Sequence, residues 1–202
     1  FYLTGIDQEE TILLLSPQAK EIKNREILFV KKTNKKIQIW EGPKLSKEEA
    51  KSISGIEKIL WLNEFDSTLK QITSQNSAIY LNKNEHYRSN SKTQTREDRF
   101  ISKFKKEYPT HSVYRSNPIL QHLRSIKDPL EINQIKKASD ITEMGFRRIL
   151  KFIKPGVWEY EIEAELLHEF ISNRSKGFAY SPIIASGKNA NILHYIKNNS
   201  QC

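Results

Sequence analysis

A long amphipathic helix in the second half of the chain constrains the fold more than any other feature. It begins at Asp128, Pro129 and Glu131, which supply an acidic N-cap, a proline at the first helical position and a glutamate at the third. Apolar residues then recur at three- and four-residue steps, at Ile132, Ile135, Ala138, Ile141, Gly145, Ile149 and Phe152. This spacing predicts one continuous apolar stripe along a helix of about seven turns, ended by Lys154-Pro155-Gly156.

The residues after this helix predict a second helix and then a β-hairpin. The helix runs from Glu159 to about Ser175, and its expected buried side holds Ile162, Leu166, Leu167, Phe170 and Ile171. The segment 180–195 then gives an apolar run, a polar turn at 186–189 and a second short run that ends at His194. We therefore expect an α+β arrangement in which both helices pack on a sheet.

The first half of the chain has the pattern of an α/β domain. Short apolar runs at 11–15, 26–30, 59–62 and 78–81 predict strands, and the alternation at 36–40 predicts an edge strand. Helix starts are predicted by the capping box at 46–49 and by Thr95 with Asp98, and a further helix is expected over 64–72. Residues 82–92 are polar and predict a loop. Alternating strands and helices favour a mixed or mostly parallel sheet with flanking helices.

The boundary between the halves is predicted at Ser116-Asn117-Pro118. Asn117 is a suitable N-cap and Pro118 a suitable first helical residue, so a short helix to about Arg124 is expected. A chain of 202 residues is long enough for two domains. We therefore predict an amino-terminal domain over residues 1–115 and a second domain over 116–202.

Composition excludes several classes of partner. The mean hydropathy is −0.64 and no apolar run approaches the ~20 residues of a membrane span, so no membrane contact is expected. The net charge of +9 comes from dispersed lysines and arginines with acidic residues between them, which predicts a solvated surface and no nucleic-acid partner. The single cysteine, Cys202, excludes an internal disulfide and fits a cytoplasmic location. The chain starts at Phe1 without a methionine, which we interpret as an internal piece of a longer protein.

The histidines and carboxylates give few signs of chemistry on their own. No histidine lies three to five residues from another, so no metal site is predicted within the chain. The glutamates at 159, 161, 163, 165 and 169 are dense, but acidic residues near a helix start also complement the helix dipole. His194 differs because it lies in an apolar segment beside Tyr195. Spacing alone favours a structural histidine there and leaves a catalytic one open.

Several segments in order resemble a known family. They are Phe1-Tyr2-Leu3-Thr4-Gly5, Ile39-Trp40-Glu41-Gly42-Pro43, the entry Arg124 to Ile132, Pro155 to Glu161, and Ser186 to Tyr195. Together they resemble the Xaa-Pro aminopeptidases (aminopeptidase P) of the creatinase/methionine aminopeptidase, or pita-bread, superfamily. The resemblance implies a creatinase-like amino-terminal domain, followed by the first part of a pita-bread catalytic domain. Trp158 departs from the pattern, since many relatives carry threonine there.

This resemblance implies a metal-dependent peptidase. In the family two divalent metal ions, usually manganese, activate water to attack the peptide bond between an N-terminal residue and a following proline. The implied ligands (two aspartates, a histidine and two glutamates) all follow the segment that ends at His194, so this chain alone is expected to be inactive. A prolidase acting on Xaa-Pro dipeptides and a non-catalytic homologue that binds other proteins remain open as alternatives.

The resemblance also implies roles for three residues. His194 matches the histidine that contacts the substrate at the scissile bond and stabilises the developing oxyanion. Phe170 and Tyr180 match positions near the active-site cavity, so both are expected to bind substrate, although both also fit ordinary core aromatics. The implied partners are peptides with proline at the second position and further copies of the chain in a homo-oligomer.

Overall fold

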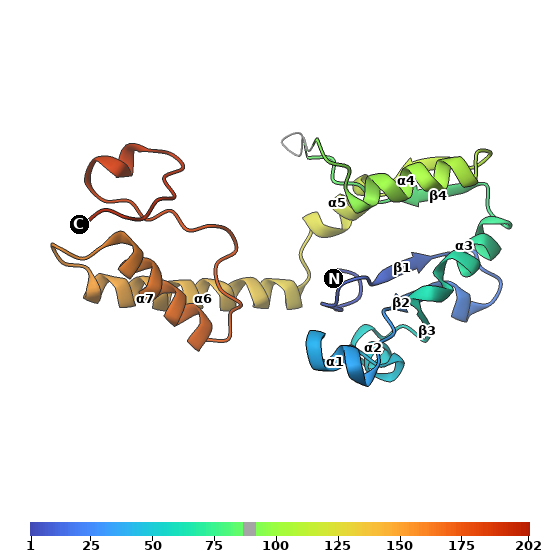
Figure 1. The fold of residues 1–202 in the computed structure, drawn as a ribbon, viewed down its shortest axis with the longest axis horizontal. Helices are drawn as coiled ribbons and strands as arrows, with labels where there is room; N and C mark the ends of the chain where they lie inside the picture. Colours follow the sequence, from blue (N-terminus) through green and yellow to red (C-terminus); the bar gives the residue numbers. More distant parts are fainter. Residues whose placement is uncertain (87–91) are drawn as a thin grey trace. The chain divides into compact units, whose positions relative to one another are not determined.

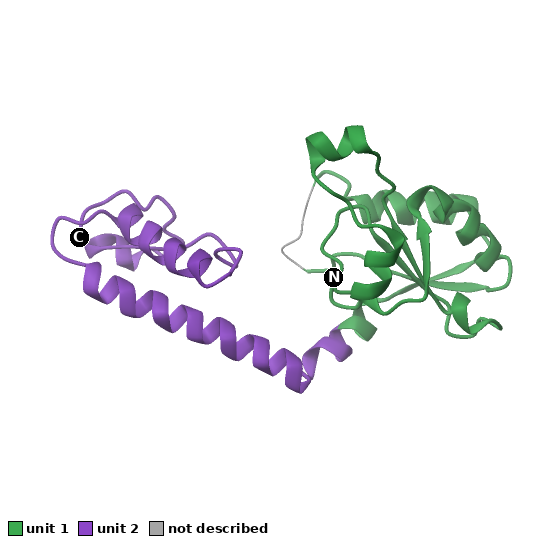
Figure 2. Cartoon of the chain, turned by 90° about the horizontal axis from the view of Figure 1, so that it is seen from below, with its two compact units in different colours: residues 1–120 green, residues 121–202 purple. Residues whose placement is uncertain are grey.

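The structure is a computed structural model that describes residues 1–86 and 92–202. It divides into two compact units, Phe1–Leu120 and Gln121–Cys202 (Figure 2). The division lies near the boundary predicted between residues 115 and 116, and that domain assignment stays a prediction. The predicted loop over 82–92 lies partly outside the described residues.

Unit 1 contains a mixed sheet and a separate pair of strands (Figure 1). Its elements are β1 (Ile12–Leu15), β2 (Glu26–Val30), α1 (Lys35–Glu41), α2 (Lys47–Ser54), β3 (Lys58–Trp61), α3 (Phe65–Thr73), β4 (Ala78–Leu81), α4 (Arg96–Glu107) and β5 (Ser112–Arg115). Short 3-10 helices cover Ile22–Asn24 and Leu62–Glu64. β2 lies between an antiparallel β1 and a parallel β3, while β4 and β5 pair in parallel. The predicted mixed sheet with flanking helices is confirmed.

The core of unit 1 forms on both faces of β2, because a central strand buries alternate side chains on opposite faces. On one face Leu28 and Val30 pack in a buried cluster with Ala50 of α2. On the other face Phe29 meets the ring of Phe65, the first residue of α3, edge to face at 5.2 Å. Helices therefore cover β2 from two sides, which explains why its last four residues are all buried.

Local helix signals in the sequence are reliable in this chain. Ser46 accepts a bond from the Glu49 amide at 3.1 Å, and the Glu49 carboxylate accepts one from the Ser46 amide at 2.8 Å. The same reciprocal pair joins Thr95 and Asp98 at the start of α4. Each pair satisfies two amides that a helix start otherwise leaves without partners.

The structure of unit 1 differs from the sequence prediction in two places. Residues 36–40 belong to α1 and not to an edge strand, because the Asn34 side chain caps the helix by accepting from the Ile37 amide at 2.9 Å. Gly42 then ends it with φ of 77°, a conformation that favours glycine. The second error is an omission, since β5 has no counterpart among the predicted strands.

Unit 2 is built on two helices. α5 (Asn117–Ser125) leads into it, followed by α6 (Pro129–Phe152), α7 (Glu159–Ser172) and a 3-10 helix at Gly187–Asn191. The predicted start of α6 is confirmed, since the Asp128 side chain accepts from the Glu131 amide at 2.9 Å. α6 and α7 pack through a small core that includes Ile149, Val157 and Ile162. No described helix has the length and apolar character of a membrane span.

A glycine sets how closely α6 and α7 approach. Gly145 is buried in α6, and a Cβ atom built there would lie 3.0 Å from both Leu166 Cδ2 and Phe170 Cε1 of α7. That distance is tighter than most real Cβ contacts, so a larger residue would require the Leu166 and Phe170 side chains to shift. Gly145 therefore acts as a contact surface for α7 in the middle of the helix.

The arrangement predicted for the second half is only partly right. The apolar stripe of α6 is buried at Gly145 and Ile149, whereas Ile132 and Ile135 are exposed, as is Ile171 of α7. Residues 121–202, all of which are described, contain no strand and only one isolated β-bridge, between Trp158 and Gln201. The two helices therefore pack on each other and on a loop, and not on a sheet. The predicted β-hairpin over 180–195 is therefore wrong.

Candidate functional site

The first residue of α7 carries a buried carboxylate that organises the loop containing His194. Glu159 is fully buried, with 0% of its surface exposed. Its Oε1 accepts bonds from the amide and the hydroxyl of Ser186, at 2.7 and 2.8 Å. Its Oε2 accepts bonds from the Tyr195 hydroxyl at 2.7 Å and the Ser200 amide at 3.0 Å. Both carboxylate oxygens are thus fully used by residues far along the chain.

These hydrogen bonds keep Glu159 ionised inside the protein. Burial favours the neutral acid and so raises the pKa of Glu159, but bonds from the Tyr195 hydroxyl, the Ser200 amide and Ser186 outweigh it. The net result is a pKa lowered to about 2. The helix start adds a favourable field for negative charge at this position.

The low pKa of Glu159 predicts a specific acid sensitivity. A group with a depressed folded pKa contributes stability that is present above its unfolded value, here 4.5, and is lost as the pH falls through about 2. Between these pH values the stability of unit 2 is therefore expected to fall more steeply in the wild type than in Glu159→Gln, where this proton is not taken up. Urea unfolding at pH 7, 4 and 3, followed through Trp158 in variants lacking the other tryptophans, measures the difference.

A matched control for this titration is Glu165→Gln, which removes a carboxylate from the same helix but leaves the loop contacts in place. Glu165 pairs with Arg148, and among the described residues no hydrogen bond or ion pair joins it to Ser186 or Tyr195. The control is expected to keep the acid sensitivity of the wild type. Identical pH curves for the wild type and Glu159→Gln would contradict the assignment.

A second carboxylate of α7 holds the same loop one turn further on. Glu163 Oε2 accepts a bond from the buried Asn198 amide group at 2.6 Å, and Asn198 Oδ1 accepts the Ile184 amide at 3.3 Å. Asn198 has φ of 48°, which asparagine tolerates better than most residues. Asn198 therefore connects the segment around Ile184 to Glu163 of α7.

The end of the described chain pairs with the entry to α7. The Glu159 amide donates to the Ser200 carbonyl at 2.9 Å, and the Cys202 amide donates to the Val157 carbonyl at 2.8 Å. The Gly156 amide donates to the Cys202 carbonyl at 2.9 Å. Residues 180–195 then bind this paired segment through side chains: the Ser186 hydroxyl donates to the Gln201 carbonyl at 3.1 Å, and the Asn189 side chain donates to Ser200 Oγ at 2.9 Å. These contacts, together with those to Glu159, take the place of the predicted strand pairing.

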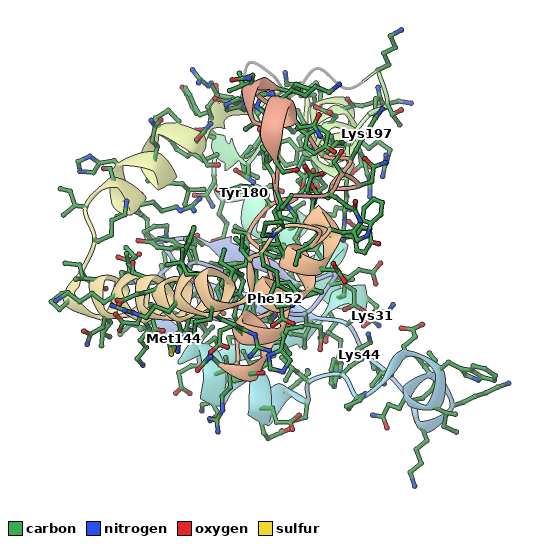
Figure 3. The ribbon with its side chains drawn as sticks, turned by 90° about the vertical axis from the view of Figure 1, so that its left-hand side faces the viewer. Lys31, Lys44, Met144, Phe152, Tyr180 and Lys197 are labelled. Atoms are coloured by element: carbon green, nitrogen blue, oxygen red, sulfur yellow. The ribbon has the colours of Figure 1, made fainter. Side chains whose placement is uncertain are left out.

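The three predicted site residues lie in three different environments. His194 lies exposed in a turn directly before the buried Tyr195. Tyr180 is 80% exposed at the start of the loop (Figure 3). Phe170 packs between the helices, with its ring 5.2 Å from that of Phe178. No hydrogen bond or ring contact among the described residues joins these three, so their proposed shared role stays a prediction.

The described residues do not fit a metal centre. They hold no group of three or more His, Cys, Asp or Glu side chains placed to bind one ion. The glutamates of α7 are committed elsewhere: Glu159 and Glu163 hold the loop, while Glu165 and Glu169 accept bonds from Arg148. The acidic cluster thus has a structural purpose.

Glu159 is the residue with the most long-range contacts to the segment around His194, and the sequence pattern does not single it out. Its position in the first turn predicts a favourable helix-dipole interaction, which any of the neighbouring glutamates also satisfies. What distinguishes it is its set of donors, which lie 27 to 41 residues away along the chain. No local spacing signals such contacts.

Comparisons with known proteins agree with this architecture. Residues 1–80 match the family model of the aminopeptidase P N-terminal domain, and residues 133–202 match that of metallopeptidase family M24. The Xaa-Pro aminopeptidases of Haemophilus influenzae and Escherichia coli are 30% and 26% identical over 98% of this chain. The chain spans 43% and 45% of their lengths, less than half of each.

A solved structure supports the same assignment over almost the whole chain. It is described as an aminopeptidase P from Bacillus anthracis, is 34% identical, and superimposes with a TM-score of 0.90 over 99% of this chain and 47% of its own. The two domain matches occur in the order that the resemblance in the sequence implies. The chain is therefore similar, in order, to the aminopeptidase P N-terminal domain over residues 1–80 and to metallopeptidase family M24 over residues 133–202.

Proposed function

We propose that this chain is part of a metal-dependent aminopeptidase that hydrolyses the bond between an N-terminal residue and a following proline. The observation that carries the proposal is the anchored loop, which presents His194 on the protein surface next to the buried Tyr195. The similarity of the chain to curated Xaa-Pro aminopeptidases, over 98% of the chain's length, supports the substrate class. The alternatives are a prolidase and a non-catalytic homologue that binds other proteins.

The role proposed for His194 is to donate a hydrogen bond to the scissile carbonyl oxygen. Charge develops on that oxygen as a nucleophile attacks, and a preorganised donor stabilises it more in the transition state than in the ground state. A proline after the scissile bond has no amide hydrogen, so its pocket needs an apolar surface for the ring. We propose Tyr180 and Phe170 for that surface, since both are aromatic and belong to the same unit as His194.

The proposed enzyme uses two divalent metal ions, with manganese as the expected metal. Such ions supply activation of water for hydrolysis at neutral pH. The described residues do not fit this centre, so its ligands are proposed to lie elsewhere in the whole protein.

A peptide series tests the function. The full-length protein, treated with chelator and then resupplied with manganese, is expected to cleave an Ala-Pro-Ala tripeptide and to leave Ala-Ala-Ala intact. Residues 1–202 alone are expected to cleave neither. Cleavage of the dipeptide Ala-Pro but not of the tripeptide would indicate a prolidase, and no cleavage by the metal-loaded protein would favour the non-catalytic homologue.

We also propose that the protein forms a homo-oligomer through α1. Ile39 and Trp40 are 80% and 84% exposed there, and α1 stands away from the three-stranded sheet (Figure 3). Ion pairs fix the base of α1, since Lys31 and Lys44 both lie within 4 Å of Glu41. Two large apolar side chains exposed side by side on one helix are suited to a protein interface.

Light scattering of the full-length protein tests this assembly. The wild type is expected to have the mass of a multimer, and Trp40→Lys is expected to shift it towards the monomer. Tyr80→Lys serves as the control, because Tyr80 is an exposed aromatic on a different element. A monomeric wild type would contradict the proposal.

We propose a cytoplasmic location on narrower grounds. The single cysteine is exposed and free, whereas secreted proteins more often carry paired cysteines. Fractionation of cells that express the full-length protein checks this, and recovery in the secreted fraction would contradict it.

A further inference from the structure

We infer that Glu159 is a positioning residue, which closes the segment 187–194 into a fixed loop and thereby holds the imidazole of His194 in place. The inference rests on the proposed role of His194. It assigns to a buried carboxylate a task in catalysis that is performed through another residue and not by contact with the substrate.

The loop is closed because both of its ends bind one side chain. Ser186, which precedes the segment, binds Oε1 of Glu159, and Tyr195, which follows it, binds Oε2. Compact surface loops of this size are defined by ends that lie close together. Closing a chain segment costs conformational entropy, and here the bonds to a single carboxylate at the start of α7 offset that cost.

Apart from Glu159, the segment is held by Asn189, which donates to Ser200 Oγ at 2.9 Å, and the turn that carries His194 lies beyond that contact. Ile192, Leu193 and Ile196 surround it and are 53%, 83% and 68% exposed, so apolar burial fixes it only weakly. Within the turn, the Tyr195 amide donates to the Ile192 carbonyl at 3.3 Å. Tyr195 itself is buried, and its hydroxyl ends on Glu159. The position of His194 thus depends on its neighbour and, through that neighbour, on Glu159.

A carboxylate is the side chain that this arrangement needs. Four donors meet its two oxygens, and an ionised carboxylate accepts at both. Glutamine has the same length, but one of its two side-chain positions is an NH₂ group. In one orientation this group would point hydrogens at the Tyr195 hydroxyl and the Ser200 amide. In the flipped orientation it would point them at Ser186. Either orientation leaves buried donors without acceptors.

Release of the loop is expected to leave the helix pair intact. The α6–α7 core consists of Ile149, Val157 and Ile162, packed with Phe152, Leu166 and Ile184. Of these only Ile184 lies beyond α7, and it precedes the segment 187–194. Loss of the Glu159 contacts therefore affects the position of His194 more than it affects the fold of unit 2.

A double-mutant cycle in the full-length protein tests the inference. Glu159→Gln is expected to lower kcat about tenfold with little change in KM. A displaced His194 imidazole would bind the developing oxyanion less well in the transition state, while substrate binding in the ground state would change little. In the His194→Ala background the same change is expected to have no further effect on kcat. An equal loss in both backgrounds would overturn the inference. A wild-type kcat for His194→Ala would instead refute the proposed role of His194.

A second readout follows the imidazole directly. In protein labelled at the histidine rings, the His194 signal of Glu159→Gln is expected to show the relaxation of a mobile side chain, while that of His168 on α7 stays unchanged. Glu165→Gln is the control and is expected to leave both signals as in the wild type. Wild-type mobility of His194 in Glu159→Gln would refute the positioning role.

A milder variant covers the case in which Glu159→Gln does not fold. Tyr195→Phe removes only the hydroxyl that joins the loop to Oε2. It is expected to give the same pattern at smaller size, with a lower kcat in the wild-type background, no loss in His194→Ala, and a more mobile His194 signal. Equal losses of kcat in both backgrounds would again overturn the inference.

Discussion

Replacing His194 by alanine in the full-length protein is expected to lower kcat on Xaa-Pro peptides by about 10²- to 10³-fold, with KM little changed. A preorganised hydrogen-bond donor to a developing oxyanion contributes on this scale when it is removed. The exposed position of His194, beside the anchored Tyr195, suits a group that meets substrate and is not buried in the core. Steady-state kinetics with a proline-containing tripeptide and saturating metal measure the effect.

The control for this variant is His168→Ala. His168 is an exposed histidine on α7, within the same unit, and lies outside the loop. Its replacement is expected to leave kcat and KM as in the wild type. Equal kcat losses for the two histidine variants would show that the effect comes from general disturbance of unit 2.

The largest loss of stability is expected for Phe29→Ala in β2, with the free energy of unfolding of unit 1 reduced by about 3–5 kcal/mol. Phe29 has 0% of its surface exposed and meets the Phe65 ring at 88°. The truncation removes this contact and leaves a cavity between the central strand and α3. Urea denaturation, compared through midpoints at constant slope, gives the change.

Tyr114→Ala is the matched control for the loss of an aromatic ring. Tyr114 stacks on Tyr80 at 5.3 Å, yet both rings are about half exposed. An exposed pair of this kind is worth about 1 kcal/mol, so the control is expected to lose much less stability than Phe29→Ala. A loss as large as that of Phe29→Ala would contradict the assigned core.

The sequence predicts best those structures that depend on neighbours along the chain. The capping boxes at Ser46, Thr95 and Asp128 each join residues three apart, and all three are confirmed. Strand β2 is also confirmed, because a continuous apolar run is the pattern of a strand buried on both faces. In these cases the signal and the interaction lie in the same short segment.

The errors arise where one pattern fits two structures or where the interaction is distant. Ile37, Ile39 and Trp40 fit a strand alternation, but Ile39 and Trp40 are exposed, so no buried face selects a strand and the Asn34 cap decides for a helix. β5 is short and buries little, which leaves it without a clear apolar pattern.

The candidate site shows the same limit. His194 stands out in the sequence because of its apolar surroundings, and its family resemblance gives it a role. Glu159 resembles its acidic neighbours until its partners are known, and the Tyr195 hydroxyl lies 36 residues away. The hairpin prediction fails for this reason, since a side chain on α7 replaces the strand pairing that the local pattern suggests.

The close approach of α6 and α7 at Gly145 has a consequence for how related sequences can vary. A Cβ atom at this position would meet Leu166 and Phe170 at 3.0 Å, so an alanine there requires more room on α7. Among natural homologues, residues larger than glycine at position 145 are therefore expected together with smaller residues at 166 or 170. These three positions should change as a set over evolutionary time, and such co-variation would record the helix contact in sequences alone.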